Sequence, residues 1–133
     1  MQDLIRKAIG ARENSYCPYS GFAVGAALLT RSGKVYTGAN IENAAFTPTN
    51  CAERTAFFKA VSEGERDFEA IAIAGGKKGE EPRDYVTPCG VCRQVMREFC
   101  NDDFKIYSVK TADDYREYSL GDLFPEGFGP DNL

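Results

Sequence analysis

The first part of the chain passes from a helical pattern of apolar residues to two strand-like runs. Up to about Asn14, an apolar stripe predicts an amphipathic surface helix, with Leu4, Ile5, Ala8 and Ile9 on one side and Arg6, Lys7 and Arg12 on the other. The runs 24–30 and 34–37 are joined by Ser32-Gly33, which is typical of an antiparallel hairpin. The first run contains Gly25, Ala26 and Ala27, so a helix is expected to pack closely over it.

The rest of the chain predicts two further helices and three further strands. Residues 51–62 are apolar on nearly every side, Phe58 included, which indicates a buried helix that could be the one packed over the hairpin. The apolar run 68–74 predicts a central strand. Residues 89–99 predict an amphipathic helix with Val91, Val95, Met96 and Phe99 facing inward. The runs 104–109 and 114–118 are too close in sequence for a parallel crossover, so they should pair antiparallel.

Together these elements predict an α/β fold in three layers, α-β-α. The expected order is helix, strand, strand, helix, strand, helix, strand, strand, with a mixed five-stranded sheet, helices on both faces and an antiparallel last strand. A chain of 133 residues is long enough to bury one core but short for two, so residues 1–133 are expected to form a single domain.

Composition and charge exclude several classes of partner. The net charge of −4 and the lack of a basic run argue against a nucleic-acid surface. The sequence shows neither the apolar core of a signal peptide nor a stretch that could cross a membrane, so we expect a cytoplasmic protein. Five cysteines without a secretory signal favour reduced thiols and a bound metal over a disulfide framework.

Candidate chemistry gathers in two short stretches that each open a predicted helix, Asn50-Cys51-Ala52-Glu53-Arg54 and Thr87-Pro88-Cys89-Gly90-Val91-Cys92-Arg93. A C-x-x-C alone could be a redox pair, half of a zinc site or chance. The chain has no histidine, so a closed structural zinc site would need Cys17, Cys100 or a carboxylate as its fourth ligand. Three thiolates with one position left for water describe an open, catalytic zinc site, beside which Glu53 is a candidate proton shuttle.

These two stretches resemble the zinc-dependent nucleoside and base deaminases. Further segments resemble the small homotetrameric cytidine deaminases of pyrimidine salvage, namely Pro18-Tyr19-Ser20-Gly21-Phe22-Ala23-Val24-Gly25-Ala26-Ala27-Leu28, Gly38-Ala39-Asn40-Ile41-Glu42-Asn43-Ala44 and Cys51-Ala52-Glu53-Arg54-Thr55-Ala56. The resemblance runs from about Pro18 to Phe128. It implies a cytidine deaminase-like fold, a homotetramer with shared active sites, and one Zn²⁺ per chain held by Cys51, Cys89 and Cys92.

The resemblance also implies how a nucleoside would be held. Asn40 and Glu42 would contact the 3′ side of the ribose, although taken alone such residues are more typical of a turn. Phe22 would be the aromatic residue within the subunit's own pocket, and the Ala52 backbone N–H would bind the base. Phe128 of a neighbouring subunit would cover the pyrimidine.

The implied reaction is the hydrolytic deamination of cytidine and 2′-deoxycytidine to uridine and 2′-deoxyuridine with release of ammonia. Glu53 would take a proton from the attacking water and deliver protons to N3 and to the departing amine. Three thiolates leave Zn²⁺ with a formal charge of −1, which weakens it as a Lewis acid. Arg54 and two helix N-termini lie close to the cysteines in the sequence, so they could reduce the negative charge on the sulfurs. Spacing alone fits an exposed Arg54 equally well.

Two alternatives remain at the level of sequence. One is a deaminase of another cytosine nucleoside such as blasticidin S, whose enzymes share the three cysteines; Asn40-Ile41-Glu42-Asn43 favours an ordinary ribose instead. The other is a non-catalytic structural zinc module, which has no reason to bury Glu53. Phe46 stands where many relatives carry Tyr, so a phenolic hydrogen bond is not carried over to this position.

Overall fold

The structure, a computed structural model, describes residues 1–133. Its elements follow the predicted order, and the bounds are α1 Gln2–Ala11, β1 Phe22–Thr30, β2 Val35–Ala39, α2 Ala52–Ser62, β3 Phe68–Lys77, α3 Gly90–Phe99, β4 Lys105–Thr111, β5 Asp114–Ser119 and α4 Leu120–Leu123. Short 3₁₀ turns, Arg12–Asn14 and Pro130–Asn132, follow α1 and end the chain. Ser119 and Asp122 form a reciprocal capping pair that starts α4.

The five strands form one sheet in the order β2-β1-β3-β4-β5. Only β3 and β4 run parallel, and α3 provides the crossover between them. The last strand, β5, pairs antiparallel with β4, with Ile106 opposite Tyr118. The mixed five-stranded sheet and the antiparallel last strand are therefore confirmed.

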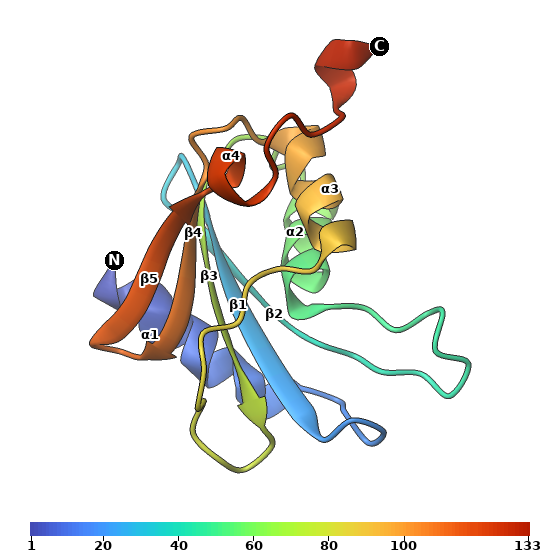
Figure 1. Cartoon of the computed structure of the whole chain (residues 1–133), viewed down its shortest axis with the longest axis vertical. Coiled ribbons are helices and arrows are strands. Elements are labelled where there is room, and N and C mark those ends of the chain that lie inside the picture. Colours follow the sequence, from blue (N-terminus) through green and yellow to red (C-terminus); the bar gives the residue numbers. More distant parts are fainter.

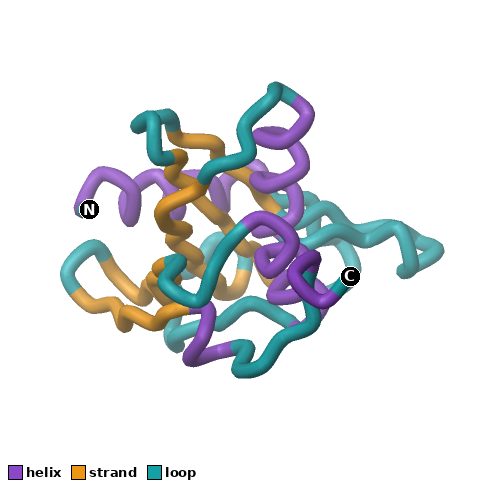
Figure 2. Tube along the Cα trace, turned by 90° about the horizontal axis from the view of Figure 1, so that it is seen from above, coloured by secondary structure: helices purple, strands orange, loops and turns teal.

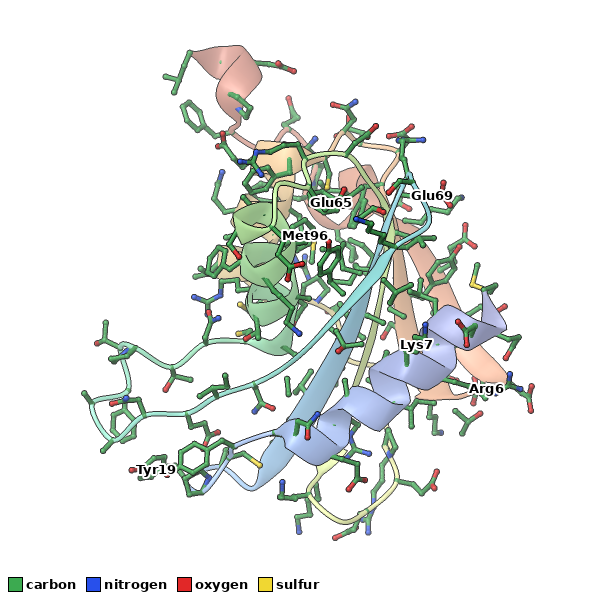
Figure 3. All side chains as sticks on the ribbon, turned by 180° about the vertical axis from the view of Figure 1, so that it is seen from behind. Arg6, Lys7, Tyr19, Glu65, Glu69 and Met96 are labelled. Atoms are coloured by element: carbon green, nitrogen blue, oxygen red, sulfur yellow. The ribbon has the colours of Figure 1, made fainter.

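Helices cover both faces of the sheet, which gives the predicted three layers (Figure 1). On one face α1 packs through Leu4, Ile5 and Ala8. On the other face α2 and α3 pack over a larger core that includes Phe57 and Met96. The view from above shows the sheet between the two helical layers (Figure 2). Arg6 and Lys7 extend to solvent from the outer side of α1 (Figure 3).

Two glycines allow helix backbones to approach the hairpin very closely. A Cβ at Gly25 would lie 2.2 Å from the Ala8 carbonyl oxygen of α1, and one at Gly38 would lie 2.5 Å from the Ala52 carbonyl oxygen of α2. A helix was expected over the small residues of β1, and the helix that begins at Cys51 was one that could lie there. The small residues in fact divide between the two faces of the sheet, because Gly25 and Ala27 lie against α1, whereas Ala26 faces α2, as does Gly38 of β2.

Three side chains correct the sequence prediction. Arg12 was expected on the polar side of the first helix but is buried, because its guanidinium donates to the carbonyl oxygens of Ala23 (2.9 Å) and Lys77 (3.1 Å). Phe58 and Val91 were expected in the core but are 49% and 56% exposed. Each helix packs against the sheet on one side only, so an apolar residue on its outer side stays exposed.

A long loop between β2 and α2 extends away from the body of the protein, and we call residues 41–50 the arm (Figure 1). Ile41 and Asn50 exchange two backbone hydrogen bonds of 2.9 Å at its base. This pairing places the end of β2 beside the start of α2. No helix in the structure combines the length and apolarity needed to span a bilayer.

Candidate metal centre and adjoining cavity

Three cysteine sulfurs meet where two helices begin. Cys51 and Cys89 are the N-cap residues of α2 and α3, and Cys92 lies in the first turn of α3. The Sγ of Cys89 lies 3.8 Å from that of Cys51 and 3.6 Å from that of Cys92. The two helices thus bring together ligands from both of the cysteine stretches identified in the sequence.

The sulfur positions fit a zinc ion. A tetrahedral ion with Zn–S bonds of about 2.3 Å places neighbouring sulfurs about 3.8 Å apart. No fourth metal-binding side chain joins the group, and Cys17 and Cys100 are buried outside it. Three protein ligands with an open fourth position are typical of catalytic zinc sites rather than structural ones.

The surroundings of the cluster favour a thiolate at Cys51. A hydrogen bond from Cys92, together with Arg54, lowers the pKa of Cys51 to about 5. The Nη2 of Arg54 lies 3.3 Å from the Cys51 Sγ. In turn, although partial burial opposes its charge, hydrogen bonds to Cys51 and Cys92 raise the pKa of Arg54. Cys92 has a raised pKa, because its thiol donates the hydrogen bond to Cys51 and because it is buried.

Glu53 occupies the first turn of α2 directly beside the sulfur cluster. Its side chain is buried, with only 5% of the residue exposed. Burial raises its pKa to about 7, because a carboxylate loses its hydration there. A carboxyl group with a pKa close to neutrality can both accept and release a proton under ordinary conditions.

A cavity of about 320 Å³ opens beside the cluster and Glu53. Its walls come from the start of β1, the residue after β2, the end of the arm and the start of α2, β3, and the segment before α3. The lining residues are Phe22, Val24, Asn40, Thr49, Asn50, Cys51, Ala52, Glu53, Ile73, Val86, Thr87 and Cys89. The structure therefore gathers predicted site residues from four separate segments around one space.

Asn40 and Glu42 are held in place by hydrogen bonds within the chain. The Asn40 Oδ1 accepts from the backbone N–H of Val24 (2.8 Å) and from the Ser15 hydroxyl, and its Nδ2 donates to the Phe22 carbonyl (2.8 Å). The Glu42 carboxylate accepts from the hydroxyl and N–H of Ser20 and the N–H of Tyr19. These bonds, the Ser20 hydroxyl first, hold the pKa of Glu42 below its usual range.

Four residues singled out in the sequence do not line the cavity. Cys92 and Arg54 contact the other cysteines of the cluster but are not part of the cavity wall. Glu42 follows Asn40 and lies on the arm. Phe128 is 58% exposed, and its carbonyl accepts a hydrogen bond from the Gln94 Nε2 of α3 (2.8 Å). The ring of Phe128 therefore does not fill the cavity of its own chain.

Sequence reasoning missed the wall formed by Val86 and Thr87. Both come directly before Pro88-Cys89, so their closeness in sequence to a predicted metal ligand could have indicated that they lie beside the site. The hydroxyl of Ser108 in β4 donates to the Val86 carbonyl (2.6 Å) and holds this segment against the sheet. No sequence pattern indicates that contact, because the two residues are 22 positions apart.

Comparison with known proteins gives consistent matches. Residues 1–108 match the model of the cytidine and deoxycytidylate deaminase zinc-binding region. A cytidine deaminase of Halalkalibacterium halodurans is 51% identical over 132 residues, which cover 99% of this chain and 96% of that protein. One from Sporosarcina psychrophila is 47% identical over 133 residues, covering 100% and 94%. The crystal structure of cytidine deaminase from Burkholderia pseudomallei superimposes with a TM-score of 0.86 at 46% identity, covering 95% of this chain and 97% of that one.

Proposed function

This chain belongs to the cytidine and deoxycytidylate deaminase family, and from that premise we propose that it hydrolyses cytidine and 2′-deoxycytidine to uridine and 2′-deoxyuridine with release of ammonia. We propose that residues 1–133 act as one deaminase domain. The observation that carries the proposal is the position of Glu53, a buried carboxyl group in the cavity wall beside three cysteine sulfurs. A structural zinc module would have no use for such a group.

Cys51, Cys89 and Cys92 would hold one Zn²⁺ per chain. When bound there, zinc supplies the Lewis acidity that makes water a competent nucleophile near neutral pH. Arg54 reduces the negative charge of the three sulfurs through its contact with the Cys51 Sγ. The N-termini of α2 and α3 act in the same direction, because their backbone dipoles favour negative charge at the two N-cap cysteines.

Glu53 would move the protons of the reaction. Its carboxylate takes a proton from the water as the water oxygen attacks C4 of the base, and it passes that proton to N3. The second proton of the water follows through the same carboxyl group to the amine, and the C4–N bond breaks to release ammonia. The raised pKa of about 7 suits a group that must be deprotonated at one step and protonated at the next.

The nucleoside would be held by other lining residues and by Glu42, which lies next to the cavity on the arm. The Phe22 ring provides an apolar wall, and the backbone N–H of Ala52 is available to the edge of the base. Asn40 and Glu42 would contact the 3′ hydroxyl of the ribose. Their hydrogen bonds within the chain support this role, because preorganised polar groups lose little entropy when they bind a ligand.

We further propose that the enzyme is a cytoplasmic homotetramer that serves pyrimidine salvage, with Phe128 covering the pyrimidine in a neighbouring subunit's site. Large apolar side chains left exposed on several elements support self-association, and they are Phe46, Phe58, Val91 and Phe128. Light scattering tests the assembly, and a fully active monomer would rule out the shared site. A Phe128→Ala chain mixed with Glu53→Gln chains should regain activity if sites are shared between subunits.

The variant Glu53→Gln tests the proposed reaction most specifically. We expect kcat for cytidine to fall about 10²-fold or more, the scale of general acid–base catalysis, while zinc content stays at about one per chain. Glu63→Gln, an exposed glutamate at the far end of α2, is the matched control and should retain full activity. Normal turnover by Glu53→Gln at full zinc content would show that Glu53 does not transfer the protons.

A further inference from the structure

The side chain of Arg93, the residue directly after the second cysteine of the C-x-x-C, joins two segments that are far apart in the sequence. Its Nε donates to the Pro88 carbonyl (2.6 Å) and its Nη2 to the Thr87 hydroxyl (3.1 Å). Its Nη1 donates to the Leu123 carbonyl at the end of α4 (2.6 Å). Arg93 does not belong to the metal-binding group and does not line the cavity, so it has no role in the reaction as proposed above.

The contact with Pro88 controls the peptide that leads into Cys89. A trans peptide is planar, so fixing the direction of the Pro88 carbonyl also fixes the direction of the Cys89 N–H and the position of its Cα. The Pro88 side chain is fully buried, which prevents the residue from shifting to restore a lost contact. The backbone N–H of Arg93 also donates to the Cys89 carbonyl (3.0 Å) and closes the first turn of α3.

The contact with Leu123 secures the position of the guanidinium itself. Three side chains of α3 donate hydrogen bonds to backbone carbonyls of the C-terminal segment. Besides the bond from Arg93 to Leu123, Gln94 donates to Phe128 (2.8 Å) and Arg97 donates to Phe124 (3.3 Å). Of these three, only Arg93 also reaches the segment before α3. A planar guanidinium has several donors in fixed directions, so it can bind acceptors on two segments at once, whereas a lysine ammonium cannot reproduce that geometry.

We propose that Arg93 is a positioning residue of the metal centre, which orients the Pro88–Cys89 peptide so that the Cys89 sulfur meets those of Cys51 and Cys92. The inference rests on the proposed zinc centre and adds a residue that tunes it. Loss of such an outer contact typically weakens metal affinity about 10- to 100-fold, because the ligand must then be ordered when the metal binds.

Competition for zinc with a chromogenic chelator tests the proposal directly. Arg93→Gln should bind zinc about 10- to 100-fold more weakly than the parent protein. Arg93→Lys should lie between the two, since it keeps the charge but not the planar set of donors. Gln94→Ala, which removes a contact with the C-terminal segment only, should keep the parent's zinc affinity. The Co²⁺-substituted proteins provide a second readout, in which the ligand-field bands should change in Arg93→Gln and not in Gln94→Ala.

The outcomes separate this inference from the proposed function. A parent protein that binds no zinc would overturn the metal centre itself. If the parent binds zinc and Arg93→Gln matches it in affinity and cobalt spectrum, only the role of Arg93 is wrong. If Arg93→Gln does not fold, Arg93→Lys decides the question, because parent-like affinity and spectrum in that variant would show that the guanidinium is not required.

Discussion

The protein places two glutamates of the candidate site in opposite surroundings. Glu53 is buried at the start of α2, and burial raises its pKa to about 7. Glu42 lies on the arm, where the Ser20 hydroxyl and two backbone amides hold its pKa below the usual range. A carboxyl group with a raised pKa can exchange protons near neutral pH, whereas one with a lowered pKa stays charged and accepts hydrogen bonds. This difference supports proton transfer at the metal end and ligand binding at the arm.

The two regions are also held together by different means. The metal end is built on the first turns of α2 and α3, whose positions are fixed by packing against the sheet. The arm is held at its base by the Ile41–Asn50 backbone pair and by side chains such as Asn40 that bond to the backbone. Substitutions at the metal end should therefore abolish turnover, whereas substitutions on the arm should weaken binding of the nucleoside.

The largest expected effect comes from removing a metal ligand. Cys89→Ala should lose zinc and all measurable deamination, and its stability should fall because zinc binding no longer stabilises the native state. Zinc content, cytidine turnover and thermal unfolding measure the three effects. Cys100→Ala, at a buried cysteine outside the cluster, is the matched control and should keep its zinc. Full zinc occupancy in Cys89→Ala would contradict a centre made of three thiolates.

A change on the arm should affect binding rather than chemistry. Glu42→Gln should raise KM for cytidine about 10-fold or more, since a hydrogen bond to a charged group is worth about 1.5–3 kcal/mol, and it should leave kcat nearly unchanged. Glu69→Gln is the control, because Glu69 is an exposed residue of β3 that lies far from Tyr19 and the arm (Figure 3).

The same variant can be used to identify the group that Glu42 contacts. On 2′,3′-dideoxycytidine, which lacks the 3′ hydroxyl, the parent protein and Glu42→Gln should have similar KM values, because the interaction is already absent. An undiminished difference on this analogue would assign Glu42 to another part of the ligand or to the structure of the arm alone.

The smallest effect is expected at Phe46, the exposed aromatic residue of the arm. The residue is 70% exposed, and its ring meets the Tyr19 ring edge-on with 6.0 Å between the ring centroids. Phe46→Tyr adds a hydroxyl group to a surface side chain, so stability should change by less than about 0.5 kcal/mol. Kinetics with cytidine should be almost unchanged. A several-fold drop in KM would instead show that this position contacts the bound nucleoside.

The sequence predicted most of what depends on local spacing. The order of helices and strands and the antiparallel final pair follow from periodicity and from short connections. The meeting of Cys51 with Cys89 and Cys92 was implied by the resemblance to the zinc-dependent deaminases, because local spacing brings together only the two cysteines of the C-x-x-C. The sequence did not fully predict which residues of α2 and α3 meet the sheet, so Phe58 and Val91 were wrongly placed in the core. Exposure of such residues depends on tertiary packing, which periodicity alone does not specify when a helix is apolar on several sides.

Contacts between distant segments were also beyond sequence reasoning. The bonds from Ser15 and Val24 to Asn40, and from Ser20 to Glu42, join residues 16 to 25 positions apart. Arg93 donates one of its hydrogen bonds to the carbonyl of Leu123, 30 positions away. Ser15, Ser20 and Arg93 look like ordinary polar residues in the sequence. Only the fold shows that each of them fixes the position of a part of the site.

The measurement that tests the account most directly is the ultraviolet absorbance of cytidine incubated with the purified protein, with zinc assayed on the same sample. We expect the cytosine band to be lost as uridine and ammonia form in equal amounts, at about one zinc per chain. A protein that carries zinc but leaves both cytidine and 2′-deoxycytidine unchanged would contradict the proposed reaction. A pure and folded protein without zinc that still deaminates cytidine would contradict the metal centre on which the account depends.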